Sequence, residues 1–127
     1  MITKLIGEGI AISYRAINTD FATASVGQDV TIGQEPEESE DRIWVLDSIQ
    51  YSFRPLDGAT LQAKPIRSEL TVFVGDKVKW NADIPDPTGV LNFHIPSQTD
   101  KVISVLLKGT DGYVGKLNVQ WHLEPAQ

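Results

Sequence analysis

Apolar and polar residues alternate with a period of two along several segments of this chain. Between residues 112 and 124, the odd positions from Tyr113 to Leu123 are apolar or glycine, and most even positions are polar. Successive side chains of a strand point to opposite faces, so this segment predicts a strand with one buried face and one exposed face. Trp121 is therefore expected in the core, and His122 is expected to face the solvent.

Further segments with strand-like composition occur along the whole chain. They are rich in β-branched and aromatic residues and lie at residues 10–17, 29–33, 43–53, 60–63, 69–84, 89–95 and 101–107. Gly75 and Asp76 divide the run at 69–84 into two, and glycine in the first central position suits a two-residue type II′ hairpin. Asp47 interrupts the apolar face of 43–53, which indicates either a β-bulge or a carboxylate directed at neighbouring backbone.

These strands, with seven prolines and ten glycines between them, predict an all-β fold: an antiparallel β-sandwich, jelly-roll-like, with about eight strands. Residues 10–127 are expected to form a single sandwich domain, and residues 1–9 an N-terminal edge strand or an arm lying on another subunit. The expected core takes one face of each strand: Ile43, Val45, Ile49, Tyr51, Phe53, Val72, Val78, Trp80, Leu91, Phe93, Val105, Leu117, Val119 and Trp121.

The composition narrows the class of protein. A chain of 127 residues is long enough to bury a core without a metal or a disulfide. It has no cysteine, which excludes thiolate nucleophiles and cysteine-bound metals. No apolar run approaches the roughly 20 residues that span a bilayer, and the opening residues lack the apolar core of a signal peptide. We expect no membrane partner and no passage through the secretory route.

The charge argues against a nucleic-acid partner. The formal net charge is −6, from 17 acidic and 11 basic residues, whereas binding to phosphates needs a clustered basic surface. Acidic residues gather in EPEESEDR at 35–42. Such a run is typical of a solvated loop, and the alternative, a calcium-binding loop, lacks the expected spacing around a central glycine.

No arrangement of residues predicts catalysis. His94 alternates with Phe93 and Ile95, so it should face outward, and two isolated histidines would need carboxylates from distant loops to bind a transition metal. Asp83 and Asp86 stand among prolines that favour a rigid turn rather than an acid–base pair. There is no G-x-S-x-G motif and no phosphate-binding loop. We therefore expect no catalytic residues, no metal, no cofactor and no enzymatic activity.

Two segments carry a resemblance to a known group of proteins. WVLDSIQYSFRPLDGATLQ and LNFHIPSQTDKVISVLLKGTDGYVGKLNVQWHLE resemble small β-sandwich structural proteins of tailed bacteriophages. The first has a strand of the form apolar-x-x-Ile-x-aromatic-Ser-aromatic before a turn that contains glycine. The second has an alternating strand that runs through a glycine-rich turn into GKLNV. The likeness covers residues 43–123 and extends loosely to ATASVGQDVTIG.

The resemblance implies a non-enzymatic virion component, specifically a capsid decoration (cement) protein that binds the outside of a phage shell and stabilises it. It implies the major capsid protein as partner, and self-association, for which a homotrimer is one arrangement. It also implies localisation to the virion after assembly in the cytoplasm of the host bacterium. A head-completion or tail-joining component is an alternative, which would form a ring of defined copy number.

Six apolar residues are candidates for contacts with the shell or with neighbouring subunits: Ile2, Leu5, Ile6, Trp44, Leu46 and Val114. The last three fall on the otherwise polar side of their strands, and exposed apolar patches mark partner surfaces. An equal alternative is that the opposite sheet or a crossing arm covers these three side chains within the monomer. A carbohydrate-binding module is the remaining alternative, which would place Trp44, Trp80 or Tyr113 in an open polar groove.

Overall fold

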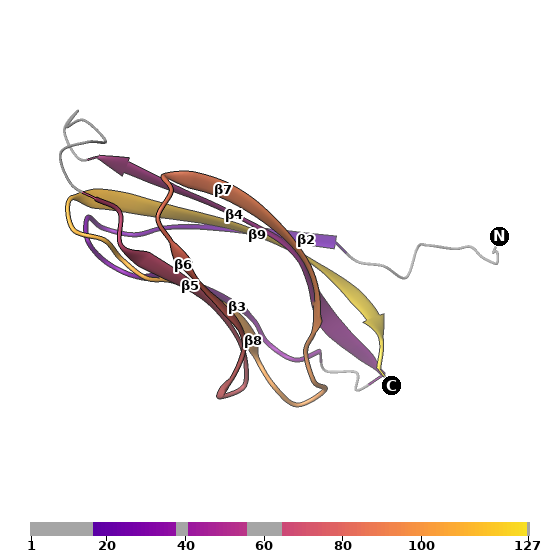
Figure 1. Ribbon diagram of the computed structural model, residues 1–127. Helices are drawn as coiled ribbons and strands as arrows, with labels where there is room; N and C mark the ends of the chain where they lie inside the picture. The colour runs from indigo at the N-terminus through magenta and orange to yellow at the C-terminus, as the bar shows by residue number, and fades with distance from the viewer. Residues whose placement is uncertain (1–16, 38–40, 56–64, 127) are drawn as a thin grey trace.

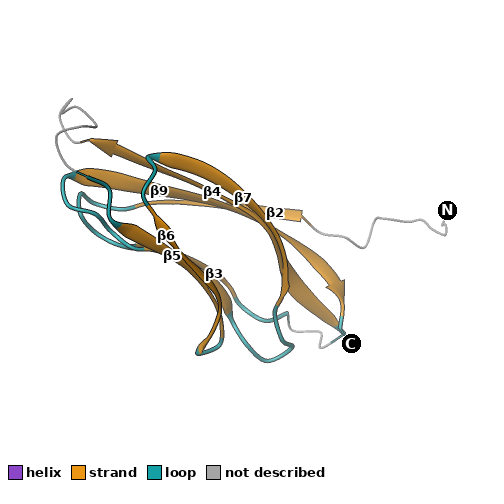
Figure 2. Cartoon of the chain, viewed as in Figure 1, coloured by secondary structure: helices purple, strands orange, loops and turns teal. Residues whose placement is uncertain are grey.

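The computed structural model describes residues 17–37, 41–55 and 65–126, which form two four-stranded antiparallel sheets packed face to face (Figure 1). This part of the chain contains strands and loops and no helix (Figure 2). The predicted all-β sandwich is therefore confirmed.

The sheets differ in the length of their strands. The long sheet has the order β2-β9-β4-β7 and contains β2 (Ile17–Thr23), β9 (Tyr113–Pro125), β4 (Arg42–Pro55) and β7 (Thr88–Pro96). The short sheet has the order β3-β8-β5-β6 and contains β3 (Val30–Gln34), β8 (Ile103–Leu107), β5 (Ser68–Val74) and β6 (Lys77–Ile84). Among the described strands, consecutive strands pair only at the β5–β6 hairpin, where Gly75 has a φ of 60°. The predicted turn at Gly75-Asp76 is confirmed.

The core is formed by the facing sides of both sheets. Burial of a large apolar side chain contributes about 1.5–3 kcal/mol before entropy is subtracted. Trp121 is fully buried, as predicted, and its Nε1 donates a hydrogen bond of 2.9 Å to Asp20 Oδ2. The same carboxylate oxygen accepts a 2.6 Å bond from Gln34 Nε2. Asp20 thus satisfies the buried indole and links β2 of the long sheet to β3 of the short sheet. The other large, fully buried side chains are Leu46, Ile49, Leu70, Ile103, Leu107, Leu117, Val45, Val72, Val105 and Val119.

A β-bulge at Asp47 reverses the faces of the first half of β4. Leu46 pairs with Trp121 and Ser48 with Gln120, so β4 has one extra residue at this point. The predicted bulge is confirmed. Its consequence is that Leu46 joins Ile49 on the inner face, because an extra residue shifts the alternation by one.

The faces predicted for Trp44 and Leu46 were therefore wrong. Both side chains lie in the core, with exposed fractions of 7% and 0%. Ile43 and Val45, which were expected in the core, pair with Glu124 and His122 on the outer face. Val45 is nevertheless fully buried there, whereas Ile43 is half-buried.

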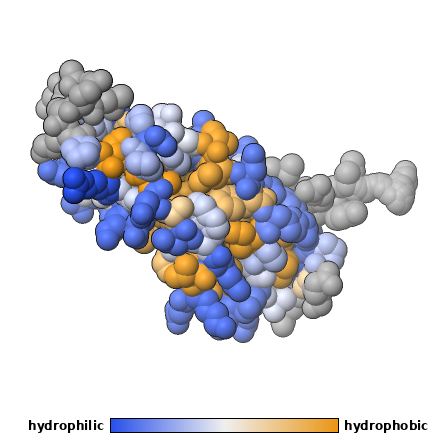
Figure 3. Space-filling view, in the orientation of Figure 1, coloured by the Kyte–Doolittle hydropathy of each residue, from blue (hydrophilic) through white to orange (hydrophobic). Residues whose placement is uncertain are grey.

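A second bulge explains a second error. Val72 pairs with Trp80 and Phe73 with Val78, so Lys79 is the extra residue of β6. Val78 was expected in the core, but it lies on the outer face of the short sheet and is 57% exposed. Trp80 is half-buried and meets Phe93 of β7 edge-on, with ring centroids 4.9 Å apart. β6 is an edge strand of the short sheet, and β7 is an edge strand of the long sheet. Figure 3, in the orientation of Figure 1, shows apolar residues among polar ones across the middle of this face.

Several predictions fall outside the described residues. They include the N-terminal edge strand or arm at 1–9, most of the strand at 10–17, the strand at 60–63 and part of the acidic run at 35–42. The strand β2, with sequence INTDFAT, was not predicted. Its single aromatic residue, Phe21, is exposed.

Candidate functional site

The predicted interface residues do not form one surface. Trp44 and Leu46 are covered within the monomer by the sandwich itself, which corrects their assignment to an outward face. Val114 lies on the outer face of β9 opposite Arg54, and it is half-buried. Ile2, Leu5 and Ile6 lie outside the described residues.

The aromatic residues proposed for a sugar-binding groove are also placed elsewhere. Trp44 is 7% exposed and Tyr113 is 2% exposed, so both belong to the core. The half-buried Trp80 packs against Phe93. None of the three therefore lies in an open groove.

His122 is held between two carboxylates. Its Nδ1 lies 2.5 Å from Asp47 Oδ1, and its Nε2 lies 2.6 Å from Glu124 Oε2. It points away from Trp121, as the alternation predicts. However, the prediction of solvent exposure was wrong, because the residue is only 2% exposed. Asp47 occupies the bulge of β4, so an irregularity in the neighbouring strand supplies one of the groups beside the imidazole.

The contact between His122 of β9 and Asp47 of β4 clamps the two strands together. The two carboxylates contact different ring nitrogens and do not converge on a common point. Accordingly, no group of three or more histidine, aspartate and glutamate residues in the described chain could hold a metal ion. His94 is 65% exposed at its side chain, as predicted, with Nε2 3.8 Å from Glu124 Oε1.

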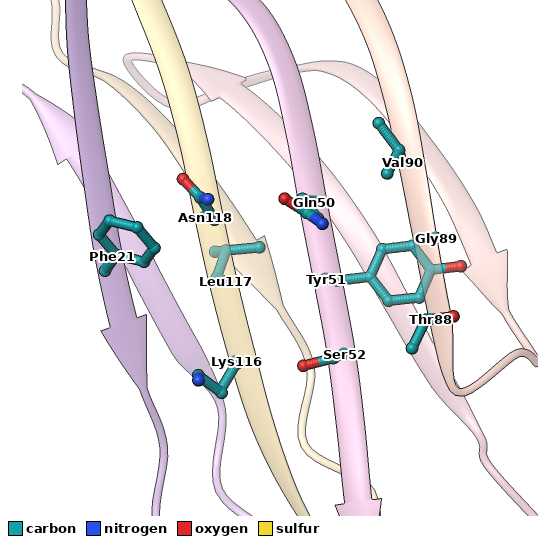
Figure 4. A pocket seen from close by; sticks show the side chains of 10 residues that line it. All are labelled: Phe21, Gln50, Tyr51, Ser52, Thr88, Gly89, Val90, Lys116, Leu117 and Asn118. Carbon is teal, nitrogen blue, oxygen red and sulfur yellow. The ribbon is translucent and has the colours of Figure 1, made fainter.

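The outer face of the long sheet contains a hollow of about 370 Å³, which we call the Phe21 hollow (Figure 4). A row of side chains crosses it from β2 to β7, because Phe21 pairs with Asn118, Asn118 with Gln50, and Gln50 with Val90. A second row contains Lys116, Ser52 and Thr88. With strands about 4.8 Å apart, the first row, which crosses four strands, is about 14 Å long.

The ends of the first row are apolar and its centre is polar. Phe21 is 72% exposed and Val90 is 62% exposed, which makes them the two most exposed large apolar residues of the described chain. Between them stand the side-chain amides of Asn118 and Gln50. The Oδ1 atom of Asn118 has no hydrogen-bond partner among the described residues.

Tyr51 and Gly89 lie between the two rows, and the Tyr51 ring packs on Gly89 at the inner side of the sheet, beneath the hollow. Tyr51 pairs with Gly89 across β4 and β7, and a Cβ atom at position 89 would collide with the Tyr51 ring and hydroxyl. In Figure 4 the ring extends from β4 to Gly89 on β7. Burial raises the pKa of the Tyr51 hydroxyl above its ordinary value of 10.0, and the negative charge of Asp86 raises it further.

The outer face of the short sheet carries an apolar cluster. Phe73 of β5 and Leu106 of β8 are half-buried, and Val78 of β6 is exposed beside them. They line a shallow hollow together with Thr71, Asn81, Asp29, Glu69 and Lys108. We call Phe73, Val78 and Leu106 the short-sheet patch.

The chain was compared with protein-family models and with curated proteins. No family model matches the chain, and no curated protein matches it. Within the described residues, no helix has the length and apolar character needed to cross a membrane.

Proposed function

We propose that this protein is a non-enzymatic capsid decoration protein of a tailed bacteriophage. The proposal starts from the resemblance of residues 43–123 to small phage structural proteins. The described residues are compatible with this role, since the buried His122 and its two carboxylate partners tie strands together. A small, rigid sandwich then acts through the surfaces that it presents.

The observation that carries the proposal is the short-sheet patch. Val78 is 57% exposed on a sheet face and adjoins two further apolar side chains, Phe73 and Leu106. Glu69, Lys108 and Asp29 surround them with charge. An apolar centre with a polar rim is the usual composition of a protein–protein interface, so this face is the one that we assign to the shell.

The geometry favours contact through the face of the short sheet rather than through its free edge. β6 is the edge strand next to the patch, and it carries Lys77 and Lys79 together with a bulge. Charged residues and bulges on an edge strand oppose the addition of another strand. The partner therefore meets side chains of the patch, not the backbone of β6.

The experiment uses phage shells stripped of decoration and increasing amounts of the purified protein, with bound protein measured after sedimentation. Val78→Asp tests the patch. Val90→Asp is its matched control, since Val90 is equally small and is 62% exposed on the outer face of the other sheet. We expect saturable binding by the wild type and by Val90→Asp, and binding at least about tenfold weaker for Val78→Asp, a loss equal to about 1.4 kcal/mol.

Each outcome has a separate meaning. Failure of the wild type to bind shells contradicts the decoration role. Equal binding by Val78→Asp contradicts the assignment of the short-sheet patch. The number of copies bound distinguishes a decoration protein, which occupies many equivalent positions, from a head-completion or tail-joining component, which forms a single ring.

A further inference from the structure

We infer that the Phe21 hollow is an oligosaccharide-binding site. This function goes beyond attachment to a shell and uses the opposite sheet from the short-sheet patch. A protein that attaches through one sheet would leave the other sheet accessible. The site differs from the sugar groove expected from the sequence, which named Trp44, Trp80 or Tyr113.

The first argument is the exposed aromatic ring beside amides. A sugar ring has a face of C–H groups, which packs on an aromatic ring, and a rim of hydroxyls, which need donors and acceptors. Phe21 supplies an open ring that is 72% exposed. Asn118 stands beside it on β9 and Gln50 on β4, in register across the sheet (Figure 4). A side-chain amide both donates and accepts, as a sugar hydroxyl does.

The second argument is the unused hydrogen-bonding capacity of the row. Asn118 Oδ1 has no partner among the described residues, and a covered acceptor without a partner destabilises the folded state. The last side-chain torsion of asparagine is broad and roughly two-fold, so the amide can turn. Such a rotation would present this oxygen to a ligand hydroxyl. Ser52, Thr88 and Lys116 add two hydroxyls and one ammonium group in the second row.

The third argument is size and charge. The hollow has a volume of about 370 Å³, within the range of roughly 300–1,000 Å³ that is common for small-ligand sites. Its lining contains one lysine and no carboxylate. These features favour a small ligand of a few sugar units over a polyanion.

The packing of the sheet beneath the first row supports the same assignment. The Tyr51 ring covers Gly89 and is only 6% exposed, so the strands beneath the row are held by a packed aromatic residue. The row is thus pre-organised by the sheet, and little backbone ordering is needed when a ligand binds.

The test applies the purified full-length chain to an array of neutral and uronate-containing oligosaccharides of two to six sugar units, followed by calorimetric titration with the strongest binder. We expect at least one oligosaccharide to bind the wild type. Phe21→Ala should weaken that binding at least about tenfold, because it removes the stacking surface. Asn118→Ala should weaken it as well.

Val78→Ala on the short sheet is the matched control and should bind the oligosaccharide as the wild type does. Absence of any bound oligosaccharide overturns the inference, and so does unchanged affinity in Phe21→Ala. Sedimentation of the wild type and Phe21→Ala adds a third outcome: a wild-type oligomer that Phe21→Ala dissociates would make this face a contact between copies and overturn the sugar site. Shell binding by Phe21→Ala should persist, which separates this test from that of the decoration role.

Discussion

The bulge at Asp47 predicts unequal effects of truncation at two residues of β4, Leu46 and Ile43. Leu46 is fully buried on the inner face, and Ile43 is half-buried on the outer face. Strict alternation without the bulge would exchange these positions, since it places Ile43 in the core. Truncation of each residue to alanine therefore reports which arrangement the protein adopts.

The expected magnitudes differ by more than the experimental error. Leu46→Ala removes a fully buried side chain that pairs with Trp121, and such a truncation costs about 3 kcal/mol, including the cavity that it leaves. Ile43→Ala removes a half-buried side chain and should cost about 1 kcal/mol. At about 4 °C per kcal/mol for a domain of this size, Tm should fall by about 12 °C and about 4 °C.

Unfolding in urea, followed by tryptophan fluorescence, measures both values. Trp44 and Trp121 are buried, so their emission should change on unfolding. The slope of the free energy of unfolding against urea should be unchanged, since a change in slope would indicate an altered denatured state. A larger loss in Ile43→Ala than in Leu46→Ala would refute the proposed effect of the bulge.

Three further predictions concern the packing of the sandwich. In a double-mutant cycle, Asp47→Asn and His122→Gln should show a coupling of about 1–2 kcal/mol in urea unfolding, and additive effects would contradict the clamp. The raised pKa of Tyr51 means that the folded state holds the hydroxyl proton more tightly, so the stabilisation is complete below about pH 10 and is lost as the pH rises through the folded-state value. This alkaline loss of stability should disappear in Tyr51→Phe. If Tyr51→Phe loses stability with rising pH as the wild type does, the loss does not come from the Tyr51 hydroxyl. Gly109→Ala places a methyl group against the backbone of Gly27 and Gln28 and should lower the free energy of unfolding by about 1–3 kcal/mol; a Tm equal to that of the wild type would show that this loop can move.

The sequence was most informative where a strand continues without interruption. In β9, Leu117, Val119 and Trp121 lie in the core as alternation predicts, because no extra residue disturbs their period. In β4 the same rule failed before Asp47, since one inserted residue exchanges the two faces. Asp47 itself was the visible signal of the bulge, but the sequence did not show on which side of it the faces would reverse.

The candidate sites depend on partners that are distant in the sequence. His122 was expected to be exposed, and one of its two carboxylate partners is Asp47, 75 residues away. Phe21 was missed because β2 has a largely polar sequence, INTDFAT, without the apolar alternation of a core strand. The sequence feature that could have indicated Phe21 is a single aromatic residue among polar neighbours. The register that sets Phe21 beside Asn118 and Gln50 arises from pairing between β2, β9 and β4.

Quantitative mass spectrometry of purified virions tests the central claim most directly. The virions are produced by a host that carries the gene for this chain, and the protein is counted relative to the major capsid protein. We predict a fixed, high ratio that corresponds to many equivalent positions on the shell. Absence of the protein from virions that are intact and infectious would contradict the account.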